Sequence, residues 1–187
     1  MPKLARPDPP LADAEVVLRP FTVADVTAVT AACQDPEIHR WTASLPWPYE
    51  ERHARHWIAT HEVRWAGGEG ADLAVTATGD GRLLGSLGFV AFDWDGRVSS
   101  VGYWVAAAER GRGVATRALR LGTDWALTTL GLGTVELVTM FGNVASERVA
   151  EKAEFSMVGE IPDYVHQAAP GRLYRVKHWQ RRAPEAR

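Results

Sequence analysis

The sequence has a single cysteine, little net charge and no long apolar run. One thiol, Cys33, excludes an internal disulfide and any zinc site built from several cysteines. The net charge of −2 at pH 7 provides no overall attraction to nucleic acid or to an anionic membrane. The apolar runs are far shorter than the ~20 residues of a membrane-spanning helix, and the first ten residues lack the apolar centre of a signal peptide. These absences favour a cytoplasmic protein without a nucleic-acid or membrane partner.

The chain also lacks internal repeats, low-complexity tracts and a Pro/Gly-rich linker. A length of 187 residues fits one domain. Four prolines and little periodicity predict a flexible N-terminal tail over residues 1–13. A polar end predicts a second tail over residues 182–187. A single domain over residues 14–181 is therefore expected.

Hydrophobic periodicity predicts the element order β-α-α-β-β-β-α-β-α-β-β. Thr22 followed by Asp25 is a capping-box pattern that opens the first helix, and Pro48 suits the first turn of the second. The expected strands are residues 15–19, 73–77, 83–92, 98–105, 134–140, 156–162 and 173–179. Two further helices are expected at 114–130 and 143–153. Because the helix 114–130 joins two strands as a crossover, those strands form a parallel pair inside an otherwise antiparallel sheet. This mixed sheet predicts an α+β or α/β fold with three layers.

A glycine-rich loop joins the strand 98–105 to the long helix. Its sequence is Glu-Arg-Gly-Arg-Gly-Val-Ala-Thr, residues 109–116. Free N–H groups at a helix N-terminus attract phosphate oxygens, and arginines add charge-assisted contacts. A Gly-x-Gly turn by itself also suits any sharp turn with positive φ. A dinucleotide fingerprint would need a third small residue at Thr116, and a triphosphate loop would need a lysine followed by serine or threonine after Gly113.

In its wider context this loop resembles the coenzyme A signature of the GNAT superfamily of N-acetyltransferases. Arg110, Gly113 and Ala115 match its pattern of Arg or Gln, two residues, Gly, one residue, then Gly or Ala. The likeness extends back over 101–105 and forward over 143–155, and the early segment 35–48 is similar to the ribosomal-protein amino-terminal acetyltransferase branch (RimJ/RimL-like). It spans about residues 15–180. The resemblance implies a mixed, mostly antiparallel sheet flanked by helices, with a splayed parallel strand pair at the cofactor site.

The resemblance also implies where acetyl-CoA binds. The pantetheine arm is expected to pair with the strand backbone at Tyr103, Trp104 and Val105. Asn143 and Ser146 match family positions beside the pantetheine and the sulfur, although Asn143 is equally suited to capping a helix. The pyrophosphate is expected on Arg110, Gly111, Arg112, Gly113, Val114, Ala115 and Thr116.

The resemblance further implies a direct transfer of acetyl to a primary amine, without a covalent enzyme intermediate. Ser146 is the first candidate to protonate the leaving thiolate and Tyr164 the second. A backbone N–H near Trp104 or Val105 would stabilise the oxyanion. Many relatives carry a general-base glutamate where this chain has Ser100, so the base is unassigned. Possible substitutes acting through water are Asp93, Asp95 and Glu109, although the two aspartates are simpler as turn residues.

The acceptor is expected to be the N-terminal α-amine of a protein or, second, a small-molecule amine. Its candidate contacts are Glu37, Trp41, Trp47 and Tyr49, residues that core packing explains equally well.

A second departure from the family pattern, Glu154 in place of a helix-ending glycine, motivates an alternative function. The alternative is a coenzyme A-binding sensor or interaction module without turnover. A homodimer is possible. His53 and His56 lack partners at metal-ligand spacing, so no metal is expected.

Overall fold

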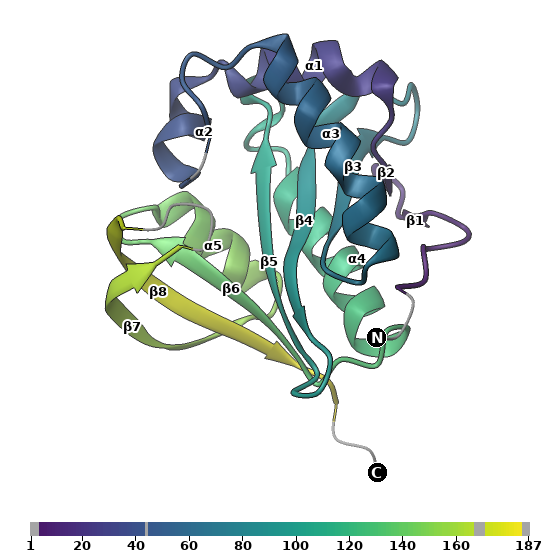
Figure 1. Cartoon of the computed structure of the whole chain (residues 1–187). Helices are drawn as coiled ribbons and strands as arrows, with labels where there is room; N and C mark the ends of the chain where they lie inside the picture. Colours follow the sequence, from purple (N-terminus) through teal and green to yellow (C-terminus); the bar gives the residue numbers. More distant parts are fainter. Residues whose placement is uncertain (1–3, 44, 167–170, 185–187) are drawn as a thin grey trace.

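The computed structural model describes residues 4–43, 45–166 and 171–184. Its eight strands form one mixed sheet in the order β1-β2-β3-β4-β5-β6-β8-β7 (Figure 1). The strands are β1 Leu11–Ala12, β2 Val16–Pro20, β3 Ala71–Ala77, β4 Leu83–Asp93, β5 Val98–Val105, β6 Thr134–Met140, β7 Ser156–Val165 and β8 Leu173–Arg182. The helices are α1 Val26–Cys33, α2 Pro36–Trp41, α3 Glu51–Ala66, α4 Val114–Thr128 and α5 Val144–Lys152, with 3₁₀ turns η1 Val23–Asp25 and η2 Ala107–Glu109.

Helices cover both faces of the sheet. The larger core lies between the sheet and α4, and a smaller one lies under α1 and α3. Gly122 allows α4 to approach the sheet closely, because a Cβ at that position would lie 2.2 Å from Leu87 Cδ2. The predicted three-layer α+β architecture is confirmed.

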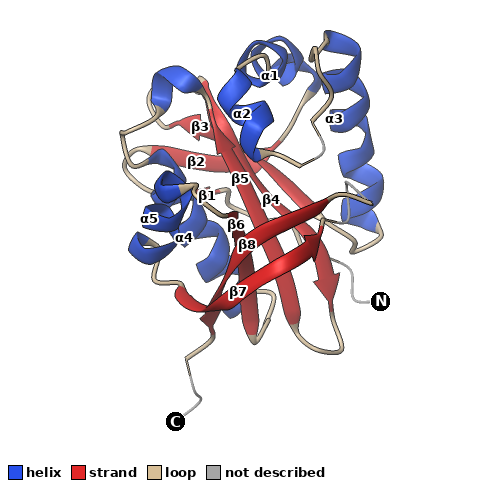
Figure 2. Cartoon of the chain, turned by 90° about the vertical axis from the view of Figure 1, so that its left-hand side faces the viewer, coloured by secondary structure: helices blue, strands red, loops and turns tan. Residues whose placement is uncertain are grey.

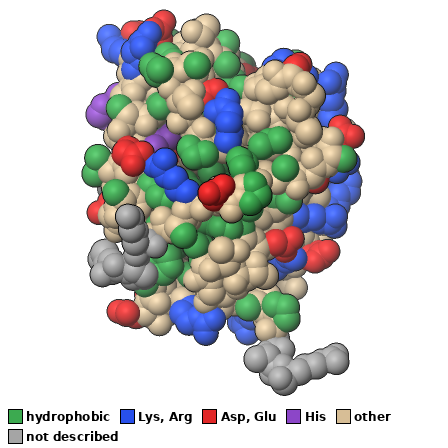
Figure 3. All heavy atoms as spheres, turned by 90° about the vertical axis from the view of Figure 1, so that its right-hand side faces the viewer, with side chains coloured by type: hydrophobic (Ala, Val, Ile, Leu, Met, Phe, Trp, Pro, Cys, Tyr) green, Lys and Arg blue, Asp and Glu red, His purple; other side chains and the backbone are tan. Residues whose placement is uncertain are grey.

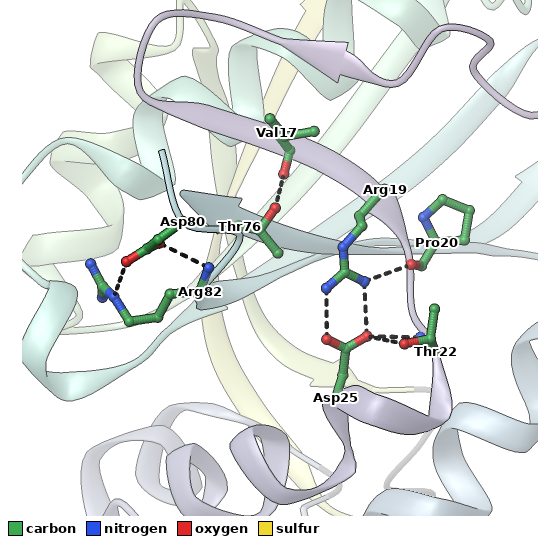
Figure 4. A network of polar contacts seen from close by, with 8 residues as sticks. All are labelled: Val17, Arg19, Pro20, Thr22, Asp25, Thr76, Asp80 and Arg82. Atoms are coloured by element: carbon green, nitrogen blue, oxygen red, sulfur yellow. Dashed lines mark hydrogen bonds and ion pairs between the residues drawn. The ribbon is translucent and has the colours of Figure 1, made fainter. Parts of the chain in front are cut away.

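A bidentate ion pair fixes the passage from β2 into α1 (Figure 4). The two guanidinium nitrogens of Arg19 donate to the Asp25 carboxylate at 2.7 and 2.8 Å. The same carboxylate accepts the backbone N–H of Thr22 at 2.8 Å. The predicted capping pattern of Thr22 and Asp25 is therefore present at the start of this helical segment.

Parts of the segment 4–13 pack against the domain. Within the segment predicted to be a flexible tail, residues 11–12 form β1, and Leu4 is 3% exposed. The carbonyl of Leu4 accepts a hydrogen bond from Trp65 Nε1 at 2.9 Å. An apolar side chain that lacks local periodicity can still be buried by a partner far along the chain, which is why the pattern did not reveal it.

The connection between the first two predicted helices differs from the expectation. Residues 36–41 form the extra helix α2, whose N-cap Asp35 accepts the N–H of Glu37 at 3.0 Å. Pro48 lies before α3 rather than in its first turn, because α3 begins at Glu51 with Glu50 as its cap. The aspartate-proline pair at 35–36 is itself a helix-start signal.

The parallel strands β5 and β6 separate along their length. They pair only at three registers, from Val98 with Thr134 to Ser100 with Glu136. Beyond Ser100, β5 continues to Val105 and β6 to Met140 without pairing, so the two strands diverge toward their C-terminal ends (Figure 1). This opening confirms the predicted splayed pair.

The outer surface carries charges of both signs. Basic and acidic side chains are interspersed with apolar ones on the face that Figure 3 shows. Among the described residues, none of the helices is long and apolar enough to span a bilayer.

Candidate active site

The β5 side of the opening exposes alternate backbone groups. Ala106 donates its N–H to Leu84 of β4 at 2.9 Å, so its backbone points away from the opening. Because successive residues of a strand point their backbone groups to opposite sides, those of Trp104 also face β4. The backbone groups of Tyr103 and Val105 therefore face the opening, where β6 no longer pairs with β5.

The glycine-rich loop leads from β5 into the N-terminus of α4. Gly111 and Gly113 have φ of 75° and 80°, a left-handed conformation that favours glycine. Gly113 is the N-cap of α4. Apart from Gly111 and its two chain neighbours, no atom of the described residues lies within 4 Å of the position that a Cβ of Gly111 would occupy. Arg117 Nε is 4.0 Å from the corresponding position at Gly113. The loop thus presents the free N–H groups of the first helical turn beside open space, which fits a pyrophosphate.

Ion pairs hold the charged residues of this loop. Arg110 pairs with the Asp35 carboxylate at the start of α2. The buried Glu109 pairs through one carboxylate oxygen with Arg82, and its other oxygen lies 3.4 Å from Arg112. Sequence reasoning missed Asp35 as a partner of the loop because 75 residues separate it from Arg110.

A hydroxyl pair spans the opening from β5 to α5. The Tyr103 hydroxyl and Ser146 Oγ lie 2.7 Å apart. Ser146 also donates its backbone N–H to Asn143 Oδ1 at 3.2 Å, so Asn143 caps α5. Burial raises the pKa of Tyr103 to about 12, a shift that its hydrogen bond with Ser146 opposes. Tyr103 is therefore protonated at neutral pH and can donate to Ser146.

The second proton-donor candidate lies on another element. Tyr164 is in β7, paired in register with Tyr174 of β8. Burial raises the pKa of Tyr164, and the nearby charge of Glu136 raises it further. The Tyr174 hydroxyl contacts the carbonyl of Ala43 at 3.5 Å, which joins the β7–β8 hairpin to the segment after α2.

The four predicted acceptor contacts separate into two groups. Trp41 Nε1 donates to Glu37 Oε2 at 3.1 Å on α2, and Trp47 is 54% exposed beside the ring of His39. Tyr49 is only 4% exposed and packs in the core under α1 and α3, so core packing accounts for its ring. Tyr49 is buried where Trp47 is exposed because apolar side chains surround its ring.

A polar group that sequence reasoning missed lies at the closed end of the opening. Glu136 Oε1 accepts from Gln180 Nε2 at 2.8 Å and lies 3.3 Å from His178 Nε2. These residues come from β6 and β8, which pair antiparallel with Glu136 opposite Gln180. No local sequence pattern indicates this group, because 44 residues separate Glu136 from Gln180.

The remaining candidates for chemistry have structural roles. His53 Nδ1 accepts the N–H of Glu50 at 3.0 Å as part of the cap of α3. Burial raises the pKa of the Cys33 thiol to about 12, which leaves it protonated and unreactive. In the described ranges, no group of three or more His, Cys, Asp or Glu side chains could hold a metal ion.

Sequence comparison identifies relatives of this chain. The profile of the acetyltransferase (GNAT) domain matches residues 15–156. Two Bacillus subtilis proteins also match. The first is YjcK, whose name describes an N-acetyltransferase. It is 31% identical to this chain over 103 residues, which cover 54% of this chain and 57% of YjcK. YdaF, whose name describes a ribosomal N-acetyltransferase, is 32% identical over 84 residues, or 45% of this chain and 46% of YdaF. The chain thus aligns with about half the length of each of these relatives.

Solved structures share the fold. RimJ of Mycobacterium smegmatis, in complex with CoA-disulfide, superposes with a TM-score of 0.78 at 22% identity, covering 90% of this chain and 82% of RimJ. The predicted family and fold are confirmed. The domain match, which includes the loop and the opening beside it, shows that the chain belongs to the GNAT family of acetyltransferases.

Proposed function

We propose that this protein transfers the acetyl group of acetyl-CoA directly to a primary amine. The observation that carries the proposal is the opening between β5 and β6, which lies next to the free helix N-terminus of α4. One end of this site is suited to a phosphate group and the other to an extended chain with amides. Acetyl-CoA has both features.

The loop and β5 would hold the two parts of the cosubstrate. Its pyrophosphate fits residues 110–116, where the left-handed Gly111 and Gly113 leave room for oxygen atoms. Its pantetheine amides fit the backbone groups of Tyr103 and Val105 that face the opening. By the same alternation, the N–H of Val105 rather than that of Trp104 is available to the thioester oxyanion. One such donor contributes roughly 3 kcal/mol to transition-state stabilisation.

The reaction itself needs two proton transfers. The acceptor must lose a proton to become nucleophilic, since a free α-amine titrates near ~8. Its nitrogen then attacks the thioester carbon, and the C–S bond breaks as the amide forms. Ser146, hydrogen-bonded to Tyr103, would give a proton to the departing thiolate, with Tyr164 as the second candidate. A covalent acetyl-enzyme is not required.

The N-terminal α-amine of a protein is our first choice of acceptor. The name of YdaF describes a ribosomal N-acetyltransferase, which supports this choice. The exposed Trp47 and the polar edge of α2 at Glu37 and Trp41 offer contacts for a peptide beside the opening. A small-molecule amine is the second choice, and it would need fewer of these contacts.

The experiment is the release of free thiol from acetyl-CoA against N-terminal peptides and small amines, with mass spectrometry of each mixture. An acetylated peptide supports the proposal. An acetylated small amine alone would replace the first acceptor by the second. Coenzyme A binding in calorimetry without any product would favour the sensor that the missing strand glutamate and Glu154 suggest.

A further inference from the structure

The residue at the usual base position has a carboxylate beside it. Ser100 occupies the position where many relatives carry a glutamate, and its register partner on the parallel strand β6 is Glu136. Neighbouring strands lie about 4.8 Å apart, and paired residues point to the same face of the sheet. Glu136 therefore lies one strand away from position 100, where many relatives carry the glutamate, and on the same face of the sheet.

This register is also where the opening begins. The pair of Ser100 and Glu136 is the last one that β5 and β6 form before they separate. On β6 the neighbours of Glu136, Val135 and Leu137, are buried in the core under α4. Since side chains alternate along a strand, Glu136 lies on the opposite face, the one that α1 and α3 cover at β3 and β4 (Figure 2).

Its neighbours keep the carboxylate in place without burying it. Gln180 Nε2 donates to Glu136 Oε1 at 2.8 Å, and His178 Nε2 lies 3.3 Å from the same oxygen. The side chains of Glu136 and His178 are 30% and 22% exposed, so a substrate amine can reach them. The negative charge of Glu136 contributes to the raised pKa of Tyr164, which places the Tyr164 hydroxyl close by on β7.

Two of the other carboxylates considered for this role, Glu109 and Asp93, are engaged elsewhere. Both oxygens of Glu109 face arginines, Arg82 and Arg112, at the phosphate end of the site. Asp93 accepts the N–H of Gly96 at 2.9 Å within the β4–β5 turn, which is the turn role expected of it.

We infer that Glu136 is the general base of this enzyme, supplied by β6 in place of the glutamate that β5 lacks. This assignment rests on the proposed function. The carboxylate takes one proton from the acceptor ammonium, which leaves the nitrogen lone pair free to attack the thioester carbon. Glu136 returns that proton to solvent, and the second proton leaves the nitrogen as the C–S bond breaks and the thiolate is protonated. His178 and Gln180 act as positioning residues for the carboxylate.

The test uses Glu136→Gln, whose amide oxygen can still accept from Gln180. General bases typically contribute 10²- to 10⁴-fold, so kcat at pH 7 should fall at least ~100-fold while the Kd for acetyl-CoA stays unchanged. The defect should shrink as the pH rises above ~8, because the α-amine is then neutral in solution. A purely structural defect would persist at high pH.

A rescue variant tests the assignment more strictly, since the side chains of His178 and Tyr164 also lie near this site. Ser100→Glu added to Glu136→Gln should recover at least a tenth of the wild-type kcat, because it puts a carboxylate one strand away on the same face. Glu160→Gln on β7, whose carboxylate pairs with Arg175, is the matched control and should match the wild type.

Each outcome separates the base assignment from the function. Wild-type turnover with Glu136→Gln within threefold of it overturns the base assignment and leaves the proposed function standing. A wild type that acetylates no amine in the panel overturns the proposed function, and the base assignment with it. Loss in Glu136→Gln together with rescue by Ser100→Glu supports both.

Discussion

Under the proposed function, a single glycine and a single hydroxyl carry much of the chemistry of the site. Gly113 has a φ of 80° and precedes the first turn of α4. Its lack of a side chain allows this backbone conformation and leaves open space at the Cβ position. Ser146 gains its orientation from two contacts, the hydroxyl of Tyr103 and the cap Asn143.

We expect Gly113→Glu to raise the Kd for coenzyme A at least tenfold, because its carboxylate would lie at the pyrophosphate site. Calorimetry measures this directly. Gly113→Ala is the matched control: it adds similar backbone strain, about 1 kcal/mol, but no charge, and its Kd should stay within about threefold of the wild type. Equal affinities for Gly113→Glu and the wild type would refute the loop assignment.

We expect Ser146→Ala to lower kcat about tenfold with an unchanged KM for acetyl-CoA. The effect is modest because a thiol of pKa ~8.5 is a fair leaving group without assistance. Steady-state kinetics at pH 7 provide the measurement. Ser156→Ala, at the exposed start of β7, is the control, and a wild-type kcat in Ser146→Ala would move the role to Tyr164.

At the scale of elements, an ion pair fixes the connection between a strand and the helix that follows it. The ion pair of Arg19 and Asp25 joins the end of β2 to the 3₁₀ turn before α1. Burial works to raise the pKa of Asp25, but the hydrogen bonds from Arg19 and Thr22 outweigh it and hold the pKa below its usual value of 3.8. The charged carboxylate is therefore bound more favourably in the folded state than in the unfolded chain.

We expect Asp25→Asn to lower the free energy of unfolding by about 2 kcal/mol at pH 7, since Arg19 loses its charged acceptor. A lowered folded-state pKa means that this contribution is complete above pH 3.8 and is lost as the pH falls through the folded-state value. Urea unfolding at pH 7 and pH 3 should thus show a smaller difference between the two proteins at pH 3. Asp80→Asn, in the exposed pair with Arg82, should cause no measurable change at either pH.

At the scale of the whole molecule, the cofactor loop and the acceptor side are joined directly. Arg110 from the loop pairs with Asp35, which also caps α2, the helix that carries Glu37 and Trp41. A pyrophosphate on the loop would compete with Asp35 for the Arg110 guanidinium. Under the proposed function, binding of acetyl-CoA on this loop would therefore be linked to α2.

We expect Asp35→Asn to tighten coenzyme A binding by up to about fivefold at low salt, because a partly exposed ion pair contributes up to about 1 kcal/mol and no longer competes. Asparagine can still cap α2, so the helix start is retained. Calorimetry at two salt concentrations tests this, since screening should reduce the difference. Weaker binding in Asp35→Asn would instead show that Asp35 orients Arg110 for the pyrophosphate.

Local features of the sequence were sufficient for most elements and for the glycine-rich loop before α4. Strand and helix periodicity predicted every strand from β2 to β8, and the crossover rule predicted the parallel pair. The glycines at 111 and 113 indicated the loop, because a backbone with positive φ favours a residue without a side chain. Such signals lie within a few residues of one another, so they can be recognised without the fold.

Tertiary structure decided which distant residues meet. The register of Ser100 with Glu136, the pairing of Tyr103 with Ser146 and the ion pair of Asp35 with Arg110 each join segments more than 30 residues apart. Strand register and helix packing determine these contacts, and local periodicity in the sequence predicts neither of them. The sequence by itself therefore determined the family and the glycine-rich loop at the start of α4. The folded sheet decided which carboxylate lies beside Ser100, because strand register joins residues that are far apart in the chain.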